Sequence, residues 1–459
     1  MVLGMMLFAT SCDDYLDIND NPNNPTKAPL AGLMTNSTFE TAQNTFRLGD
    51  VTSQYVQYTA SPNPASSVDI MEESSFDNLW ANLYGVMTDL NDMINKAEES
   101  GANHYKGAGQ ILLALNLAMT VDSFGDVPFS QSFNFETITP TYDEDALLYA
   151  EVLLLLDQGI ANLSQGTDLP LGNDDFIYGG DAENWVKFGY MLKARYLNHL
   201  NGAGSYDPAV ILASIDMGFD SNAEDAQVEY FEEEINPWAN VAIRNENLLL
   251  GGWISEQYIE ANDGTYKAED PRLPLLIGTT DDGEFIGVVN GAGRGSAAES
   301  GERSTLIPGQ FYTSRQSPLL IATYFEQKFI EAEAAFSVDK TRSYEAYLEG
   351  IRANMRKVGV AAGDIQSYIN DSQVSMGESN FTLDDIFGEK WKAMFLHPEA
   401  WVDARRYDYQ YEGFDLPENL NPDLNGQFIR RLAYPDSERS RNGQNVPDVS
   451  LLDRIFWDK

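Results

Sequence analysis

Cysteine and histidine, the residues that most often bind metals in proteins, are almost missing from this chain. The 459 residues include one cysteine, Cys12, which excludes a disulfide framework and a thiolate metal site. The three histidines, His104, His199 and His397, lie far apart in the sequence, and none belongs to an HExxH zinc motif. We therefore interpret each histidine as a structural or surface residue and expect no metal site.

Basic residues are also few. The chain has 29 lysines and arginines against 71 aspartates and glutamates, which gives a formal net charge of −42. A surface this acidic repels phosphate backbones, so nucleic acid is disfavoured as a partner. The same charge argues against polyanionic ligands, except where a local basic pocket compensates for it.

The common motifs of hydrolytic and nucleotide-binding enzymes are missing as well. No serine has glycine both two residues before and two residues after it, as a nucleophile elbow requires. The glycine-rich residues 291–296 (GAGRGS) do not have the spacing of a GxGxxG loop. Carboxylates are so numerous that a glycosidase-type acid pair is compatible with the sequence, but any chosen pair is uninformative. The sequence therefore does not point to an enzyme.

Cys12 follows a short apolar run that ends in Ala-Thr-Ser. This pattern resembles the lipobox of bacterial lipoproteins, in which the peptide is cut before the cysteine and the new N-terminus is acylated. We expect residues 1–11 to be a lipoprotein signal peptide, residues 12–30 a lipidated tether rich in Asn, Asp and Pro, and residues 31–459 one domain. The basic residues usual in a signal peptide are missing before Lys27, which is consistent with a translation start further upstream.

The apolar run before Cys12 is too short to span a bilayer, which takes about 20 apolar residues. No other stretch is expected to reach that length without charges. We therefore expect the body of the protein to be attached to a membrane only through lipid, each buried methylene contributing about 0.8 kcal/mol.

Apolar residues recur at three- and four-residue steps through much of the chain, which predicts amphipathic helices. One series runs from Phe76 to Ile94, and the next from Ile111 to Met119. A third helix is predicted over residues 147–163, and because residues 152–156 (VLLLL) make it apolar on nearly all sides there, we expect it to be central. Further helices are predicted over residues 181–200, 319–336, 344–358, 383–392 and 401–406.

Long connections rich in Gly and Asp separate these helices, chiefly residues 165–180, 218–250, 262–317 and 408–450. Connections of this length are usually functional or contain small elements of their own. The helices fall into pairs, which suits a tetratricopeptide-like solenoid, although the sequence has no clean 34-residue repeat.

Several short motifs connect the chain with a known family. The most specific are residues 121–128 (VDSFGDVP), 180–188 (GDAENWVKF) with 192–195 (LKAR), 324–326 (YFE) before 331–335 (EAEAA), and 389–394 (EKWKAM) with 403–406 (DARR). Residues 270–273 (DPRL), 434–438 (YPDSE) and the opening 12–29 accompany them. Together, and in this order, they resemble the SusD/RagB family of outer-membrane nutrient-binding lipoproteins, most closely its starch-binding-associated group.

The conspicuous residues of these motifs are expected to belong to the scaffold. Three aromatic residues are interpreted as core anchors: Trp185, Phe188 and Trp391. Three arginines in helices of so acidic a protein are expected to pair with carboxylates such as Glu331 or Glu333: Arg195, Arg405 and Arg406.

The resemblance implies a mainly α-helical fold, with a tetratricopeptide-like solenoid of four helix pairs and long ligand-binding loops packed on one side. It also implies a lipoprotein anchored by Cys12 in the outer membrane and exposed at the cell surface. Members of the family capture glycan or peptide fragments without catalysis and deliver them to a SusC-type TonB-dependent transporter. Asp13 and Asp14 resemble the acidic stretch that directs such lipoproteins to the outer face.

Sugar binding without catalysis requires flat aromatic surfaces and planar polar groups. The resemblance places the ligand site in loops, so aromatic residues expected in loops are the candidates. We predict ligand contacts from six residues: Tyr55, Tyr58, Trp238, Trp253, Tyr312 and Arg315. The competing interpretation is that each of these aromatic residues fixes its own loop to the scaffold.

The sequence leaves other functions open. A peptide ligand would fit the same transport role, and no feature of the sequence separates it from an oligosaccharide. A lipid-anchored glycoside hydrolase or peptidase, and a helical-repeat adaptor that binds only proteins, are the alternatives from other classes. No cofactor is expected, and a structural Ca²⁺ is compatible with the many Asp and Asn residues, although no ligand spacing identifies one.

Overall fold

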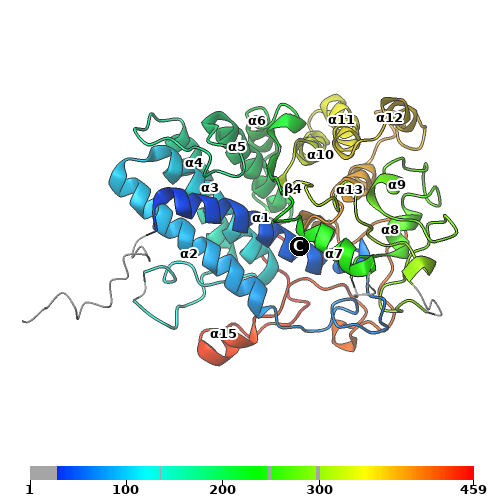
Figure 1. The fold of residues 1–459 in the computed structure, drawn as a ribbon, viewed down its shortest axis with the longest axis horizontal. Coiled ribbons are helices and arrows are strands. Elements are labelled where there is room, and N and C mark those ends of the chain that lie inside the picture. Colours follow the sequence, from blue (N-terminus) through cyan, green and yellow to red (C-terminus); the bar gives the residue numbers. More distant parts are fainter. Residues whose placement is uncertain (1–27, 135, 247–250, 296–299, 459) are drawn as a thin grey trace, which may run out of the picture.

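Successive helices pack side by side in an arc that runs across the molecule (Figure 1). The computed structural model describes residues 28–134, 136–246, 251–295 and 300–458, and within them the architecture is mainly helical. The arc consists of α1 (Leu30–Tyr55), α2 (Asp77–Ser100), α3 (Asn103–Phe124), α4 (Asp145–Leu163), α5 (Ala182–His199), α6 (Pro208–Ile215), α10 (Tyr324–Ala335), α11 (Lys340–Val358) and α12 (Ala362–Ile369).

Shorter elements lie beside this arc. Helix α13 (Leu383–Ala393) packs against α10, α11 and α14 (Glu399–Arg406) of the later part of the chain. The remaining helices are α7 (Pro237–Glu246), α8 (Glu256–Glu260), α9 (Leu273–Leu276) and α15 (Asp436–Arg441). Single 3-10 turns occur at η2 (Leu200–Ala203), η3 (Asn222–Glu224), η4 (Ser300–Glu302) and η5 (Pro422–Leu424).

The strands of the described residues form two small antiparallel pairs. Strand β1 (Thr59–Ala60) pairs with β3 (Trp253–Ile254), and β2 (Ala226–Val228) pairs with β4 (Leu319–Ala322). The register of the second pair shifts between Ala226 and Gln227. Both pairs join segments far apart in the sequence, so they fix the long connections to the helices.

Local sequence explains where several helices begin and end. The side chain of Asp181 accepts hydrogen bonds from the first turn of α5, and Thr382 with Asp385 forms a capping box at the start of α13. Helix α2 ends at Gly101, whose φ of 68° is a left-handed conformation that glycine adopts without strain. Helix α3 ends before Gly125 (φ 75°), where an added Cβ would come within 3.0 Å of the Arg431 guanidinium.

Helix α4 is only partly central. Its residues Val152 and Leu156 are fully buried, and the helix packs against α3 and α5. Leu147 and Leu154 are 65% and 48% exposed, so one face of this helix is at the surface and the expectation of a central helix is met only in part. By length and apolar composition α4 could cross a membrane, although it contains the charged residues Glu151 and Asp157 and so is not a charge-free stretch of the kind expected to be absent. This is weak evidence for a span, because a helix that packs inside a domain passes the same test.

The structure adds elements that the periodicity did not reveal. Helix α1 occupies 26 residues for which no helix was predicted, and α12 was not predicted either. Residues 319–322 form strand β4 rather than the start of the predicted helix, which begins at Tyr324. The other predicted helices correspond to α2, α3, α5, α11, α13 and α14.

The motif arginines lie in the interior, as the scaffold interpretation predicts. Arg406 pairs with Glu333, one of the expected carboxylates. Arg195 pairs instead with Glu326, which precedes Glu331 by five residues in α10. Arg405 stacks over Trp401, with 3.7 Å between its guanidinium carbon and the ring centroid, and donates to main-chain carbonyls. It forms no ion pair with a carboxylate among the described residues, so the expectation for Arg405 is wrong. The three aromatic anchors are buried as predicted: Trp185, Phe188 and Trp391.

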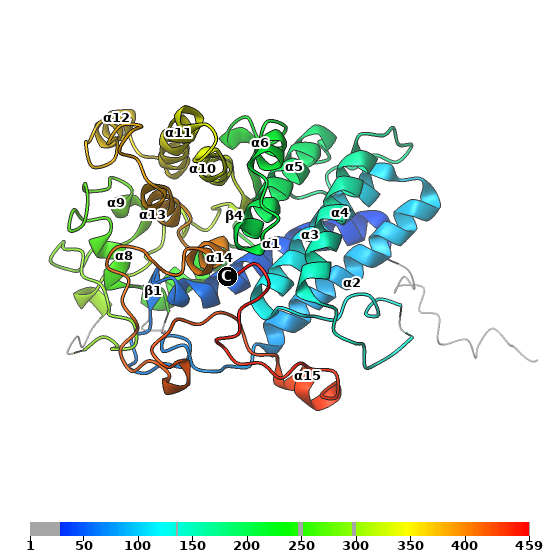
Figure 2. The ribbon, with the colours of Figure 1, turned by 180° about the vertical axis from the view of Figure 1, so that it is seen from behind.

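The C-terminal segment returns to the middle of the molecule, beside α14 and α1 (Figure 2). There the indole nitrogen of Trp457 donates to the carboxylate of Asp122 at 2.9 Å, and the ring is 1% exposed. The main buried cluster extends from Leu33 to Trp457, so both ends of the described chain share it. The division into a signal peptide (1–11), a tether (12–30) and one domain (31–459) stays a prediction.

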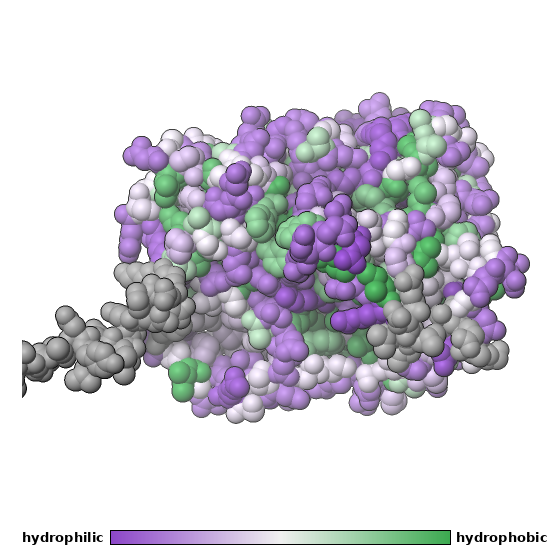
Figure 3. Space-filling view, viewed as in Figure 1, coloured by the Kyte–Doolittle hydropathy of each residue, from purple (hydrophilic) through white to green (hydrophobic). Residues whose placement is uncertain are grey.

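The surface agrees with the composition. The face in Figure 3 is mostly hydrophilic, and its hydrophobic residues form scattered patches. Isolated apolar residues on a surface are normal in folded proteins and need no partner.

Candidate ligand-binding site

Two of the predicted contact residues lie at the end of α1 and just beyond it. Tyr55 is the last residue of that helix and Tyr58 follows it, and both side chains are 0% exposed. Tyr55 packs 5.5 Å from the ring centroid of Trp401, and the Tyr58 hydroxyl donates to the carbonyl of Trp391. Burial raises the pKa of both phenols. Both rings join α1 to the C-terminal helices.

The other predicted aromatic residues are also inside the protein. Trp238 lies in α7 and Trp253 in β3, not in irregular loops, and their exposures are 3% and 2%. Tyr312 is 7% exposed and lies 5.9 Å from the ring of Phe395. The structure therefore favours the competing interpretation, in which these aromatic residues fix their segments to the scaffold, because a buried ring offers no flat face to a sugar.

Arg315 is the exposed member of the predicted set. Its side chain is 49% exposed and forms an ion pair with Glu232 at 3.0 Å. Cys12 lies outside the described residues, so its lipidation stays a prediction. Ligand contact by the six predicted residues likewise stays untested.

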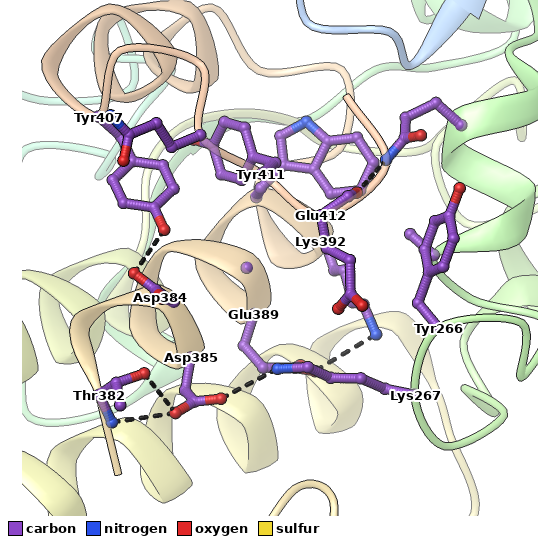
Figure 4. A pocket seen from close by; sticks show the side chains of 15 residues that line it. Tyr266, Lys267, Thr382, Asp384, Asp385, Glu389, Lys392, Tyr407, Tyr411 and Glu412 are labelled. Atoms are coloured by element: carbon purple, nitrogen blue, oxygen red, sulfur yellow. Dashed lines mark hydrogen bonds and ion pairs between the residues drawn. The ribbon is translucent and has the colours of Figure 1, made fainter. Parts of the chain in front are cut away.

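A cavity of about 510 Å³ lies between α8, α13 and the segment that follows α14 (Figure 4). Its lining combines tyrosine and tryptophan with amides, lysines and carboxylates. The residues are Gln257, Ala261, Tyr266, Lys267, Thr382, Asp384, Asp385, Gly388, Glu389, Trp391, Lys392, Tyr407, Gln410, Tyr411 and Glu412. None of the six predicted contact residues is among them.

A sharp turn after α14 brings two tyrosines to the same wall of the cavity. Asp408 and Tyr409 have φ angles of 51° and 55°, a conformation that L residues rarely adopt. The chain therefore reverses direction, and the rings of Tyr407 and Tyr411 come within 5.2 Å of each other. Backbone strain of this kind is often stored at functional sites.

The aromatic groups are held in place from behind. Tyr407 stacks on Phe387 with 4.4 Å between ring centroids and donates its hydroxyl to Asp384 at 2.6 Å. Burial and this hydrogen bond raise the pKa of Tyr407, so the phenol stays a neutral donor. Tyr411 is 9% exposed, and its buried hydroxyl has no hydrogen-bond partner among the described residues. Such an unsatisfied group is uncommon in a folded protein.

The inner wall contains a buried cluster of four charges. Arg272 donates to Asp270 at 2.6 Å and to Glu389 at 2.8 Å. Lys392 lies 3.4 Å from Glu389, 3.9 Å from Asp270 and 3.3 Å from the hydroxyl of Tyr368. Burial raises the pKa of Glu389, but Lys392 and Arg272 outweigh it and hold that pKa below its usual range. The wall is therefore ionised, rigidly paired and neutral as a group.

A second hollow of about 610 Å³ lies over the first turns of α1 and is more open than the cavity. Phe39, Phe176 and Phe231 line it together with Glu233 and Glu234. It offers fewer planar polar groups than the cavity beside α13, so we take the less open cavity beside α13 as the better candidate.

Among the described residues, no group of three or more His, Cys, Asp or Glu side chains is arranged to hold a metal ion. A structural Ca²⁺ stays a prediction. Sequence reasoning missed the cavity because its walls come from three segments that lie far apart in the sequence. One local signal was present: residues 407–412 (YDYQYE) place three tyrosines and two carboxylates in six residues.

The sequence match decides the family. Residues 22–435 match the protein-family model SusD-like_2, described as "Starch-binding associating with outer membrane". The chain belongs to this SusD-like family. The match covers most of the chain, so the resemblance inferred from the motifs is confirmed. No curated protein matches the sequence.

Solved structures show the same SusD-like fold. A SusD/RagB family protein from Bacteroides thetaiotaomicron is 22% identical, with a TM-score of 0.76 over 94% of this chain and 99% of its own. A chitin-binding protein is 20% identical, with a TM-score of 0.78 over 94% and 100% of the two chains. A chitin-binding SusD homolog from Flavobacterium johnsoniae is 19% identical, with a TM-score of 0.76 over 93% and 98%. At these identities the likeness shows the fold.

Proposed function

We propose that the protein is a non-catalytic lipoprotein of the cell surface that captures oligosaccharides and delivers them to a SusC-type TonB-dependent transporter. Membership of a starch-binding, outer-membrane-associated family supports the nutrient-binding role. The chitin-binding names of two solved SusD-like structures favour a carbohydrate over a peptide as the ligand.

The observation that carries the proposal is the cavity beside α13. Pyranose rings present apolar faces that stack on aromatic side chains, and hydroxyls that bond planar polar groups. Tyr266 and Tyr407 supply aromatic surface, while Gln257, Gln410 and Glu412 supply amide and carboxylate groups. A cavity of about 510 Å³ lies within the usual range for small-ligand sites.

The most buried carboxyl group of the cavity does not fit the general acid of a glycoside hydrolase. A general acid in such an enzyme needs a carboxyl group whose pKa is raised, so that it holds a proton near neutral pH. Glu389, the most buried carboxyl group of the wall, has a lowered pKa because Arg272 and Lys392 are paired with it. It therefore stays ionised and cannot donate a proton.

Isothermal titration calorimetry on the full chain with starch- and chitin-derived oligosaccharides tests the proposal. The variant Tyr266→Ala removes a half-buried ring of the cavity, and we expect it to weaken binding by roughly tenfold. Tyr190→Ala is the matched control, because Tyr190 is a half-buried tyrosine of α5 that does not line the cavity. Equal weakening of binding in both variants would show that the ligand does not bind in this cavity.

Other outcomes would overturn the function. Reducing ends released in proportion to protein would indicate a hydrolase. Binding of peptide pools without binding of any glycan would replace the ligand but keep the transport role. No small ligand, together with a transporter barrel retained in a pull-down from outer membranes, would support the protein-adaptor alternative.

A further inference from the structure

A smaller hollow of about 90 Å³ adjoins the cavity beside α13. The two share Gln257 and Tyr266, so the Tyr266 ring stands between them. The smaller hollow is also lined by Glu256, Glu260 and Asp415. We call the two hollows together the joined cavity.

The cations that line the joined cavity are already neutralised. The ammonium of Lys267 pairs with Asp385 at 2.9 Å. Lys392 is 6% exposed and lies between Glu389 and Asp270, at 3.4 and 3.9 Å. Neither lysine is therefore free to bind an anionic ligand.

Five further carboxylates line the joined cavity without a cation. None of them forms an ion pair with a Lys, Arg or His of the described chain: Asp384 and Glu412 in the larger part, and Glu256, Glu260 and Asp415 in the smaller. In Figure 4 the Glu412 side chain projects into the cavity.

The pKa of one carboxyl group in the smaller part reflects the same excess of carboxylates over cations. Burial raises the pKa of Glu256, and the neighbouring Glu260 raises it further, while Arg303 opposes both. Burial is the larger cause of this raised pKa, and the part due to Glu260 reflects the negative charge of a neighbouring carboxylate. The protein as a whole carries a formal charge of −42, so its overall field has the same sign.

Unpaired carboxylates beside tyrosine rings favour ammonium groups. A carboxylate attracts an ammonium and hydrogen-bonds to it, and the face of a tyrosine ring attracts cations through its quadrupole. We propose that the joined cavity binds oligosaccharides bearing protonated amino groups, in preference to neutral and acidic ones. This inference rests on the proposed function, because it names the class of glycan that the proposed site takes.

A matched series of ligands tests the preference. Oligomers of glucosamine and of N-acetylglucosamine of equal length differ in the acetyl group, which replaces each ammonium by a neutral amide, and a galacturonate oligomer carries the opposite charge. At about pH 6 an amine of this kind is protonated. We expect the glucosamine oligomer to bind roughly fivefold tighter than the acetylated one, and the uronate not to bind. The advantage should shrink with added salt, because exposed charges are screened.

A variant pair locates the effect. Glu412→Gln removes one unpaired charge with little change of shape, and it should reduce the preference for the amine with little effect on the acetylated oligomer. Glu99→Gln is the control, because Glu99 is an exposed carboxylate near the end of α2, away from the joined cavity. Equal melting temperatures would show that both variants fold.

The outcomes separate the inference from the proposed function. Equal binding of the two glucosamine-type oligomers, or tight binding of the uronate, would overturn the amine preference and leave an oligosaccharide-binding protein. No binding of any glycan would overturn both. Binding of a lysine-rich peptide and of none of the oligomers would also overturn the inference, because the ammonium would then come from a protein.

Discussion

Arg195 and Glu326 form a two-bonded ion pair inside the protein that joins α5 to α10. The guanidinium Nε lies 2.7 Å from Oε1 and Nη2 lies 2.6 Å from Oε2, and the side chains are 2% and 1% exposed. Arg195 also donates to the carbonyl of Ile321 in β4 at 3.0 Å. The pair therefore holds three elements together where the first half of the arc meets the second.

The variant Glu326→Gln should destabilise the protein strongly. It leaves a buried guanidinium without its main counter-charge, a loss that typically costs about 3–5 kcal/mol. Urea unfolding followed by circular dichroism measures the change. The control is Glu349→Gln, which removes a more exposed ion pair with Arg356 and should cost about 1 kcal/mol or less. Equal losses in the two variants would contradict the structural role of the buried pair.

Asp225 should make stability depend on pH. Burial raises its pKa from 3.8 to about 6 in the folded protein, although Lys357 lies 2.6 Å from it. Between these two values the folded state keeps a proton that the unfolded state releases. This contribution to the free energy of unfolding is therefore complete below pH 3.8 and is lost as pH rises through about 6.

The shift of about two pH units corresponds to about 3 kcal/mol at most. The free energy of unfolding of the wild type and of Asp225→Asn is measured from about pH 4 to pH 7. The wild type should lose this contribution over that range, and the variant should not. Parallel curves would show that Asp225 titrates alike in both states.

Gly107 should tolerate no side chain. A Cβ at this position of α3 would come within 2.7 Å of the carbonyl oxygen of Gly159 and of Leu163 in α4. Gly107→Ala should therefore push the two helices apart and cost about 1–3 kcal/mol. Gly85→Ala is the matched control in α2, where an added Cβ meets nothing within 4 Å. That change should stabilise the protein by about 0.5–1 kcal/mol, because alanine is the better helix former. A lower melting temperature for both variants would contradict the close helix contact.

Cys12 should determine where the protein is located in the cell. Cys12→Ser removes the thiol that would be acylated, and with it the roughly 0.8 kcal/mol contributed by each buried methylene. We expect the variant to leave the membrane fraction and to lose incorporation of a labelled fatty acid. A wild-type protein without label, or a variant that stays in the membrane, would contradict lipid anchoring.

The hydrophobic pattern predicted α2, α3 and α5 well because each presents apolar residues at helical spacing to a core. Helix α1 escaped the same reasoning for a physical reason. Its buried face contains Thr41 and Asn44, which look like surface residues in a hydrophobic pattern. In the structure Asn116 of α3 satisfies both, because it donates to Thr41 at 2.9 Å and accepts from Asn44 at 3.1 Å. Polar residues can be buried when partners from another helix are in place.

The candidate site was less predictable than the fold. Tyr55, Trp238 and Trp253 were chosen because they were expected in loops, yet each lies in a helix or a strand and packs inward. Trp391 was interpreted as a core anchor and is buried, yet it also lines the cavity. A sequence shows that an aromatic residue is present, but not which of its faces a neighbouring segment covers.

The sequence by itself determined the family, most of the helices and the acidic character of the surface, because motifs, periodicity and charge are local properties of the chain. Only the tertiary structure decided which tyrosines and carboxylates line a cavity and which cations are already paired. The walls of the cavity come from residues 257–267, 382–392 and 407–412, which are brought together by helix packing. The selectivity of such a site depends on distances between these segments, and those distances are set by the whole core.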